Sequence, residues 1–287
     1  VILEDESLIS SYKMNEYDTI TDYIYSQKGK KIANELKLKQ QQLIENIKIE
    51  NIEIDNLIDI QLDLDCTVMT DGDFRRAWWH LDFLEQFNGI DGHKIRDGLK
   101  YKDAISKPYD VRVTGKISFN EDHTCLAHYR YLHEAIDGFA TAKFCLPSPN
   151  MMLYPYLRNN RTYTEKLDEY AQDLALSFNQ AIMALYAEGC RYIQINDQFL
   201  AYLCDENYRA KEIEEGLNPE DLAKLCVEVL NKSLQDKPED LFIALHIDRG
   251  NFSSSWLYSG GYEFLADHVF EKLTNIDRYL LEFDTER

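Results

Sequence analysis

Short apolar runs, rich in β-branched and aromatic residues, recur along the chain from residue 64 onward, and each of them ends in polar residues. Runs of this length and composition predict β-strands. The six clearest runs are Cys66–Thr70, Asp110–Phe119, Thr141–Leu146, Arg191–Asn196, Leu241–Ile247 and Arg278–Phe283.

Helix-length amphipathic stretches separate several of these runs. The clearest is Leu167–Ala187, which Gly189 follows as a stop signal. Its apolar stripe consists of Leu174, Phe178, Ile182 and Leu185. Leu217–Leu234 and Tyr262–Leu273 have the same character. Strands that alternate with helices predict a parallel sheet.

The spacing of the strand ends indicates which parallel fold this is. The ends lie near residues 73, 118, 148, 196, 248 and 282, so each interval has room for one crossover helix. No glycine-rich phosphate-binding motif accompanies them, which favours a TIM (β/α)8 barrel, an α/β fold, over a dinucleotide-binding fold. One more strand is expected before residue 66. Because the sequence given stops soon after the sixth run, we expect a barrel that is incomplete at its C-terminal side or closed in an unusual way.

The first 60 residues have a different pattern, rich in Lys, Glu, Ile and Asn. Residues 28–58 place Ile and Leu at helical spacing among charges and contain no Pro, which predicts long exposed helices. A poorly packed arm is the alternative. We therefore expect a helical segment at residues 1–60, part of the barrel or packed on it, and a barrel domain at residues 61–287.

Composition excludes several classes of function. The formal net charge of −20 disfavours binding to nucleic acid. No apolar run reaches the roughly 18 residues of a membrane span, and no signal peptide is visible. Six cysteines without a Cys-x-x-Cys pair do not indicate a disulfide framework. A reduced, cytoplasmic protein that acts on small molecules fits best, and its oligomeric state is not indicated.

Catalytic side chains of barrels gather at the C-terminal ends of the strands, so the polar residues there are the candidates. Thr70–Arg76 places two acids, Asp71 and Asp73, beside two arginines, Arg75 and Arg76, and these could bind the ammonium and carboxylate groups of an amino acid; a surface turn with internal ion pairs is the alternative. Trp78 and Trp79 precede His80 and Asp82, and such aromatics either stack on a flat ligand or belong to the core.

Three later strand ends add candidates. Ser148 lies between two prolines in a rigid turn, which shapes a pocket wall or is an ordinary loop. Gln194 and Asn196 share one face of their strand, where a ligand or other partners must satisfy them. His246 and Asp248 also share a face and could bind a metal, although a core histidine beside a capping aspartate is commoner.

Two further polar residues complete the set. Arg249 adds a cation for a carboxylate or phosphate, next to a glycine that allows a tight turn. Glu282 follows the last strand at the place of a third metal ligand, or is an ordinary strand-end carboxylate.

In their order and placement, these segments resemble the cobalamin-independent methionine synthase family, most closely its shorter single-barrel branch. The resemblance covers about three quarters of the chain, from Thr70 to Arg287. The segments that carry it are Thr70–Arg76, Pro147–Pro149, Gly189–Ile195, His246–Asn251, Gly260–Glu263 and Leu281–Arg287.

The resemblance implies an S-methyltransferase. In that family a zinc ion deprotonates the thiol of homocysteine, and the thiolate takes the methyl group of methyl-tetrahydrofolate, including its polyglutamate forms. Carried over, the catalytic and metal-ligand positions are His246, Asp248 and Glu282. A fourth ligand, a Cys, would follow Arg287. The positions that hold the ammonium group of the amino acid are Asp73 and Asn196.

This chain departs from the family at each of these groups. Asp248 replaces a Cys ligand, Asn196 replaces an Asp, and Asp73 replaces a Glu. An aspartate is a harder zinc ligand than a thiolate, and an asparagine supplies no negative charge. The departures leave several readings open. They include a different donor or acceptor, a weak metal site, a barrel enzyme of the uroporphyrinogen decarboxylase type, and a degenerate homologue without catalysis.

Overall fold

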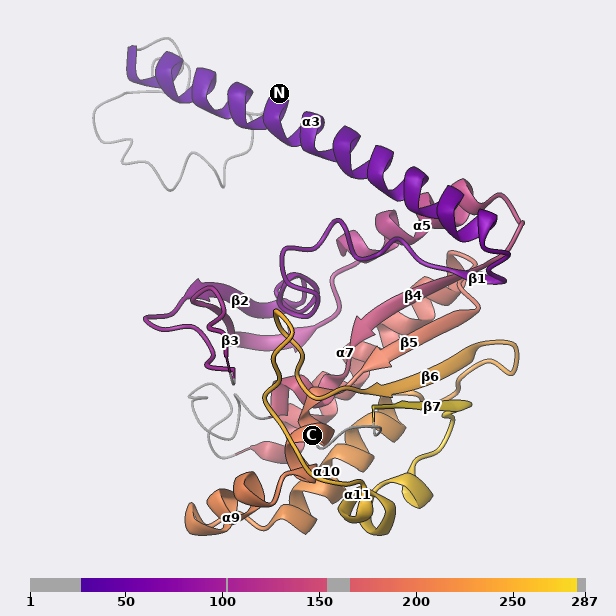
Figure 1. The fold of residues 1–287 in the computed structure, drawn as a ribbon. Helices are drawn as coiled ribbons and strands as arrows, with labels where there is room; N and C mark the ends of the chain where they lie inside the picture. Colours follow the sequence, from indigo (N-terminus) through magenta and orange to yellow (C-terminus); the bar gives the residue numbers. More distant parts are fainter. Residues whose placement is uncertain (1–26, 102, 154–165, 283–287) are drawn as a thin grey trace. The chain divides into compact units, whose positions relative to one another are not determined.

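Five of the predicted strand runs form one parallel sheet in the computed structural model, which describes residues 27–101, 103–153 and 166–282 (Figure 1). The strand order is β1-β4-β5-β6-β7, so the strands of this sheet lie side by side in the order in which the chain reaches them. The strands are β1 (Val68–Met69), β4 (Thr141–Pro147), β5 (Tyr192–Asn196), β6 (Phe242–Ile247) and β7 (Arg278–Leu281). The fold is therefore α/β, with a curled five-stranded parallel sheet that represents part of a barrel.

The register of the central strands aligns their polar ends. Pro147 pairs with Asn196, and Asn196 pairs in turn with His246. Side chains alternate between the two faces of a strand, so residues in one row across the sheet share a face. The buried positions of β5, Ile193 and Ile195, point to the opposite face from Gln194 and Asn196, which are half-buried. The polar residues thus line one face of the sheet.

Helices cover the other face of the sheet, and the side chains that they bury are those of the predicted apolar stripes. In α7 (Leu167–Ala187), Leu174, Phe178, Ile182 and Leu185 are all at most 2% exposed, and the helix ends where predicted. α10 (Pro219–Ser233) begins at Asn218, whose side chain accepts a hydrogen bond from the amide of Glu220, and it packs on α7. Each fully buried Leu, Ile or Phe stabilises the fold by about 1.5–3 kcal/mol.

Shorter helices connect the strands. α5 (Thr124–Ile136) packs on β4, and η1 (Pro149–Met152) and α8 (Gln198–Cys204) follow directly after β4 and β5. The stretch predicted as one helix at Tyr262–Leu273 is instead α11 (Glu263–His268) followed by the 3-10 turn η2 (Phe270–Lys272). Two further short helices are α4 (Leu81–Leu84) and α9 (Glu206–Glu214).

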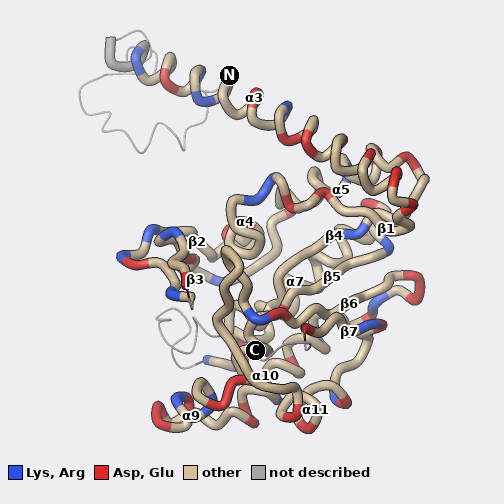
Figure 2. Tube along the Cα trace, in the orientation of Figure 1, with Lys and Arg blue, Asp and Glu red and all other residues tan. Residues whose placement is uncertain are grey.

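The run Asp110–Phe119 is a strand but does not join the parallel sheet, which corrects the sequence prediction. As β3 (Tyr109–Ser118) it pairs antiparallel with β2 (Asn88–Lys94), a strand that no apolar run had indicated. The sequence of β2, Asn-Gly-Ile-Asp-Gly-His-Lys, has one aliphatic residue and two glycines. The loop between the two strands carries a cluster of basic residues (Figure 2). They include Arg96, Lys100 and Lys107, and Lys94 at the end of β2 lies next to them in the sequence.

The N-terminal part of the described chain is one helix, α3 (Gln27–Asp63), where long helices were predicted. The chain divides into two compact units between Asn56 and Leu57. The strand expected before residue 66 is absent from residues 27–65, and residues 1–26 lie outside the described part. No described helix combines the length and the apolar character needed to cross a membrane.

Candidate functional site

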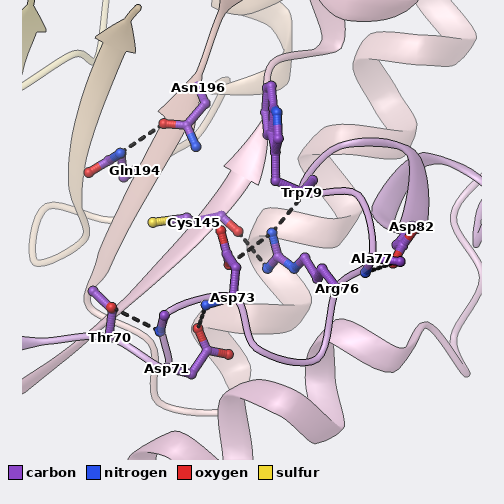
Figure 3. Close-up of polar contacts among 11 residues, drawn as sticks. Thr70, Asp71, Asp73, Arg76, Ala77, Trp79, Asp82, Cys145, Gln194 and Asn196 are labelled. Carbon is purple, nitrogen blue, oxygen red and sulfur yellow. Dashed lines mark hydrogen bonds and ion pairs between the residues drawn. The ribbon is translucent and has the colours of Figure 1, made fainter. Parts of the chain in front are cut away.

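A chain of hydrogen bonds crosses the polar face of the sheet from β4 to β6. The Lys143 ammonium donates to Oε1 of Gln194 at 3.0 Å, and Nε2 of Gln194 donates to Oδ1 of Asn196 at 2.8 Å. The Nδ1 atom of His246 lies 3.0 Å from the same Asn196 oxygen. Figure 3 shows the Gln194–Asn196 part of this chain, which we call the β4–β6 polar chain. It brings together Gln194, Asn196 and His246, three of the predicted site residues.

The turn after β1 is held by short-range hydrogen bonds. Gln61 clamps Thr70 by accepting from its amide and donating to its carbonyl, both at 3.0 Å. Asp71 accepts from the amide of Asp73 at 3.0 Å. Gly72 and Asp73 both have positive φ, at 64° and 56°, a region that Gly and Asp tolerate better than other residues. This local chemistry fixes the position of the Asp73 carboxylate.

Arg76 ties this turn to the sheet (Figure 3). Its guanidinium donates to the carbonyl of Cys145 at 2.7 Å and to that of Trp79 at 3.2 Å, and it forms an ion pair with Asp73 at 3.3 Å. Both arginines were candidates from the sequence, and Arg75 rather than Arg76 was predicted to bind the ligand. Arg75 instead lies over the ring of Tyr131 in α5, 4.7 Å from its centre.

Asp73 has a raised pKa because its carboxylate is largely desolvated. The neighbouring Arg76 lowers that pKa, the charge of Asp71 raises it, and Lys143 lowers it, so burial prevails. The interactions with Lys143 and with the Cys145 thiol place Asp73 beside the β4–β6 polar chain. Asp73 is thus the acidic group at this end of the site.

The end of β6 carries a second acidic pair. The Asp248 carboxylate accepts hydrogen bonds from the amide of Gly250 and from Gln198. Burial raises the pKa of Asp248, and Glu282 raises it further by charge repulsion, against the opposing effect of His246. Glu282 accepts from Nδ2 of Asn251 through both of its carboxylate oxygens, at 2.8 and 3.1 Å. His246, Asp248 and Glu282 therefore lie within electrostatic reach of one another.

These three side chains do not fit a zinc ion as they are arranged. Nδ1 of His246 and both oxygens of Glu282 already have protein partners, and Asp248 is held by Gly250 and Gln198. In the described residues, no three His, Cys, Asp or Glu side chains converge tightly enough to hold one metal ion. Zinc sites require such convergence, with ligand distances near 2.0–2.3 Å.

Arg249 is buried directly behind the end of β6. Only 2% of the residue is exposed, and its guanidinium stacks on the Tyr262 ring at 4.6 Å. Its Nη1 atom has no hydrogen-bond partner in the described part of the chain. The Tyr262 hydroxyl donates to the main-chain carbonyl of Glu282 at 2.7 Å, so these residues also brace the β7 end.

Ser148 is fully buried and forms part of the scaffold beneath the site. Its hydroxyl accepts from the amide of Asn150 at 3.1 Å and bonds to Asp197, which is also fully buried. Asp197 further accepts from Nδ2 of Asn150 and from the amide of Leu200, both at 2.8 Å. Sequence reasoning had assigned no role to Asp197, which joins the turn after β4 to the start of α8.

His80 borders a cavity of about 170 Å³ next to these strand ends. Its ring lies 4.6 Å from that of Trp79, and burial lowers its pKa to about 4. Among the described residues its Nδ1 atom has no hydrogen-bond partner. Gln198, which bonds to Asp248, lines the same cavity, so the cavity opens toward the β6 end. The other lining residues include Leu99, Asp110, Met151, Phe199, Tyr202 and Tyr258.

Asp82, also predicted as a ligand-binding residue, has a structural partner. Its carboxylate accepts a hydrogen bond from the amide of Ala77 and thereby closes the turn before α4 (Figure 3). Of the predicted residues, the structure places Asp73, Gln194, Asn196, His246, Asp248 and Glu282 along the strand ends. Arg75 and Asp82 face other partners.

Comparisons with known proteins identify relatives of the chain. It is 37% identical over 258 residues to YxjH of Bacillus subtilis (strain 168), covering 90% of this chain and 66% of that protein. YxjG of the same organism is 37% identical over 241 residues, covering 84% of this chain and 63% of that protein. Both relatives are themselves uncharacterized, and no family model matches the chain. The chain thus spans just under two thirds of the length of these relatives.

Two solved structures are similar. A Listeria monocytogenes protein, provisionally described as a vitamin-B12-independent methionine synthase, aligns with a TM-score of 0.64 and 34% identity, over 84% of this chain and 64% of that one. A B12-independent methionine synthase from Shewanella sp. W3-18-1, in complex with selenomethionine, aligns with a TM-score of 0.53 and 18% identity, over 72% of this chain and 54% of that one. The second likeness shows the fold alone.

Proposed function

Because the chain belongs to the cobalamin-independent methionine synthase family, we propose that it binds a homocysteine-like amino-acid thiol at its strand ends and serves S-methyl transfer. The methyl donor in this proposal is a methyl-tetrahydrofolate. The strand order β1-β4-β5-β6-β7 supports the further proposal that the complete protein closes an eight-stranded barrel around this site.

The observation that carries the proposal is the convergence of Asp73, Asn196 and His246 on one face of the sheet. They come from three different strand ends. The register and a hydrogen bond hold Asn196 and His246 beside one another, and Arg76, which forms an ion pair with Asp73, ties Asp73 to the carbonyl of Cys145 in β4. Convergent polar groups from several strands at the C-terminal edge are typical of substrate sites in barrels.

Each group has a donor or acceptor role in the proposal. The Asp73 carboxylate binds the ammonium group of the amino acid, as a charge-assisted hydrogen bond. The Oδ1 atom of Asn196 accepts from Gln194 and contacts Nδ1 of His246, which occupies both of its lone pairs. The Nδ2 group of Asn196 is therefore the part of the amide that can bind a ligand. Nδ2 donates, which suits a thiolate or carboxylate of the ligand.

The remaining parts of the ligand have room nearby. The 170 Å³ cavity beside His80 is lined mainly by apolar and aromatic side chains and lies next to Gln198. The basic loop between β2 and β3 contributes Leu99 to the cavity wall. Its positive charge would attract an anionic tail, such as the glutamates of a folate, in a chain whose net charge is −20.

No step of this proposal is assigned to zinc, since the described donors do not converge. Zinc dependence remains a prediction from the family. It is tested by elemental analysis of protein purified without added metal, in which stoichiometric zinc that is lost in His246→Ala supports it. Absence of bound zinc at neutral pH would contradict it for this chain.

The test of the function is methionine formation from L-homocysteine and the triglutamate form of 5-methyl-tetrahydrofolate. The assay uses the full chain, with and without added zinc, and Asp73→Asn as the inactive control. Methionine formed by wild type and reduced at least tenfold in Asp73→Asn supports the proposal. No methionine above the background without protein contradicts it.

A second candidate function is ligand binding without catalysis. The observation in its favour is that protein groups engage the side chains of Asp248 and Glu282, the positions of two metal ligands in the family. Saturable binding of homocysteine together with no methionine formation under any metal condition would favour this candidate.

A further inference from the structure

The β4–β6 polar chain has a direction, and Lys143 sets it. An ammonium group has three donors and no lone pair, so the Gln194 atom that faces it at 3.0 Å must be the oxygen. The amide nitrogen of Gln194 then points the other way, toward Asn196 at 2.8 Å. Because that nitrogen can only donate, the Asn196 atom that meets it must be an oxygen.

The same logic extends to the imidazole. The Asn196 oxygen also lies 3.0 Å from Nδ1 of His246, and an oxygen can only accept. Nδ1 must therefore carry a hydrogen, which in the neutral ring leaves the lone pair on Nε2. Free histidine side chains favour the opposite tautomer, with the hydrogen on Nε2, so the protein has to impose this one.

The substitution that distinguishes this chain makes the orientation necessary. The family resemblance places an aspartate where this chain has Asn196. Either oxygen of a carboxylate accepts a hydrogen bond, whereas an amide accepts at one end and donates at the other. A free asparagine could rotate and offer its nitrogen to His246, which would stabilise the wrong tautomer.

We propose that Lys143 and Gln194 are positioning residues that orient the Asn196 amide and thereby fix His246 as the Nδ1–H tautomer. His246 then keeps its Nε2 lone pair free to accept a proton, and Asn196 presents its Nδ2–H. The use of that lone pair rests on the proposed function, but the tautomer itself does not. Partners that hold the second ring nitrogen are the usual means by which proteins select a histidine tautomer.

The test is nuclear magnetic resonance of the full chain with ¹⁵N-labelled histidine. Long-range ¹H–¹⁵N correlations distinguish a protonated from an unprotonated ring nitrogen. Spectra are recorded with EDTA at alkaline pH, where imidazoles are neutral, and the loss of signals in His246→Gln assigns His246 among the seven histidines. We expect a protonated Nδ1 and an unprotonated Nε2 in wild type.

The variants separate positioning from general stability. Lys143→Met and Gln194→Leu should each shift the tautomer ratio of His246 about fivefold or more toward Nε2–H, because one hydrogen bond no longer orients the next. Lys143→Arg should restore the wild-type ratio. Lys224→Met, which removes an exposed lysine of α10, is the matched control and should leave the ratio unchanged.

A double variant adds a test that does not depend on whether any one single variant folds. With Asn196→Asp, the carboxylate accepts from Nδ1 in any orientation, so adding Lys143→Met should no longer change the ratio. A wild-type His246 with its hydrogen on Nε2 overturns the proposal. So does a folded Lys143→Met protein with the wild-type ratio. Neither result depends on zinc or on methyl transfer, so failure of the proposed function would be recognised separately.

Discussion

Replacing Arg76 with methionine should destabilise the unit formed by residues 57–287 far more than the same change at Arg75. The Arg76 side chain is 5% exposed and donates to the carbonyls of Cys145 and Trp79. Hydrogen bonds from a charged donor contribute about 1.5–3 kcal/mol each. The ion pair with Asp73, whose side chain is 31% exposed, adds less than about 1 kcal/mol. We therefore expect a loss of about 3–5 kcal/mol.

Arg75→Met is the matched control for this prediction. The Arg75 guanidinium lies over the Tyr131 ring, and a cation–π contact of this kind contributes about 0.5–2 kcal/mol. Both variants keep an unbranched apolar stem, so the comparison isolates the guanidinium group.

Unfolding in urea, followed by tryptophan fluorescence, measures the free energy of unfolding of residues 57–287 in both variants. All three tryptophans, Trp78, Trp79 and Trp256, belong to residues 57–287, so the signal does not report on the other unit. An Arg76→Met variant that loses less than about 1 kcal/mol, or less than Arg75→Met, would refute the assignment of Arg76 as the link between the turn and the sheet.

Three further predictions follow from the same geometry. Asp197→Ala leaves Asn150 and the amide of Leu200 without their acceptor and should cost about 3 kcal/mol in the same urea experiment; a cost below about 1 kcal/mol would contradict the role of Asp197. Burial raises the pKa of Asp73, and only its ionised form binds an ammonium group. Homocysteine affinity should therefore fall as the pH is lowered through that raised pKa, and the affinity of Asp73→Asn should not follow this profile. Asp248→Cys replaces a carboxylate with a thiolate and should tighten zinc binding, as measured by competition with a chelator; weaker binding would show that Asp248 is not in a ligand position.

Periodicity was sufficient to predict the elements of the core. The stripe of α7 and the ends of β4, β5 and β6 agree with the sequence prediction to within one or two residues. These elements bury apolar side chains at regular intervals, which is the signal that sequence patterns carry. β2 has almost no such signal, so neither the strand nor the antiparallel pairing of β3 with it could be predicted.

The site was predictable by position but not by orientation. Strand ends indicated Asn196 and His246, and the register makes them direct neighbours. The turn from which Arg76 reaches the sheet contains positive φ angles at Gly72 and Asp73, and the sequence pattern specifies neither these angles nor which arginine faces the sheet. Lys143 was missed because it lies within a strand, two residues before Cys145, rather than at the strand end.

The proposed binding of an amino-acid thiol at the strand ends is tested most directly by isothermal titration of the full chain with L-homocysteine. We predict saturable binding that weakens about tenfold to a hundredfold in Asp73→Asn, because a charge-assisted hydrogen bond to the ammonium group is lost. The exposed variant Lys224→Met should bind as wild type does. No binding at millimolar homocysteine, or equal binding by wild type and Asp73→Asn, would contradict the account.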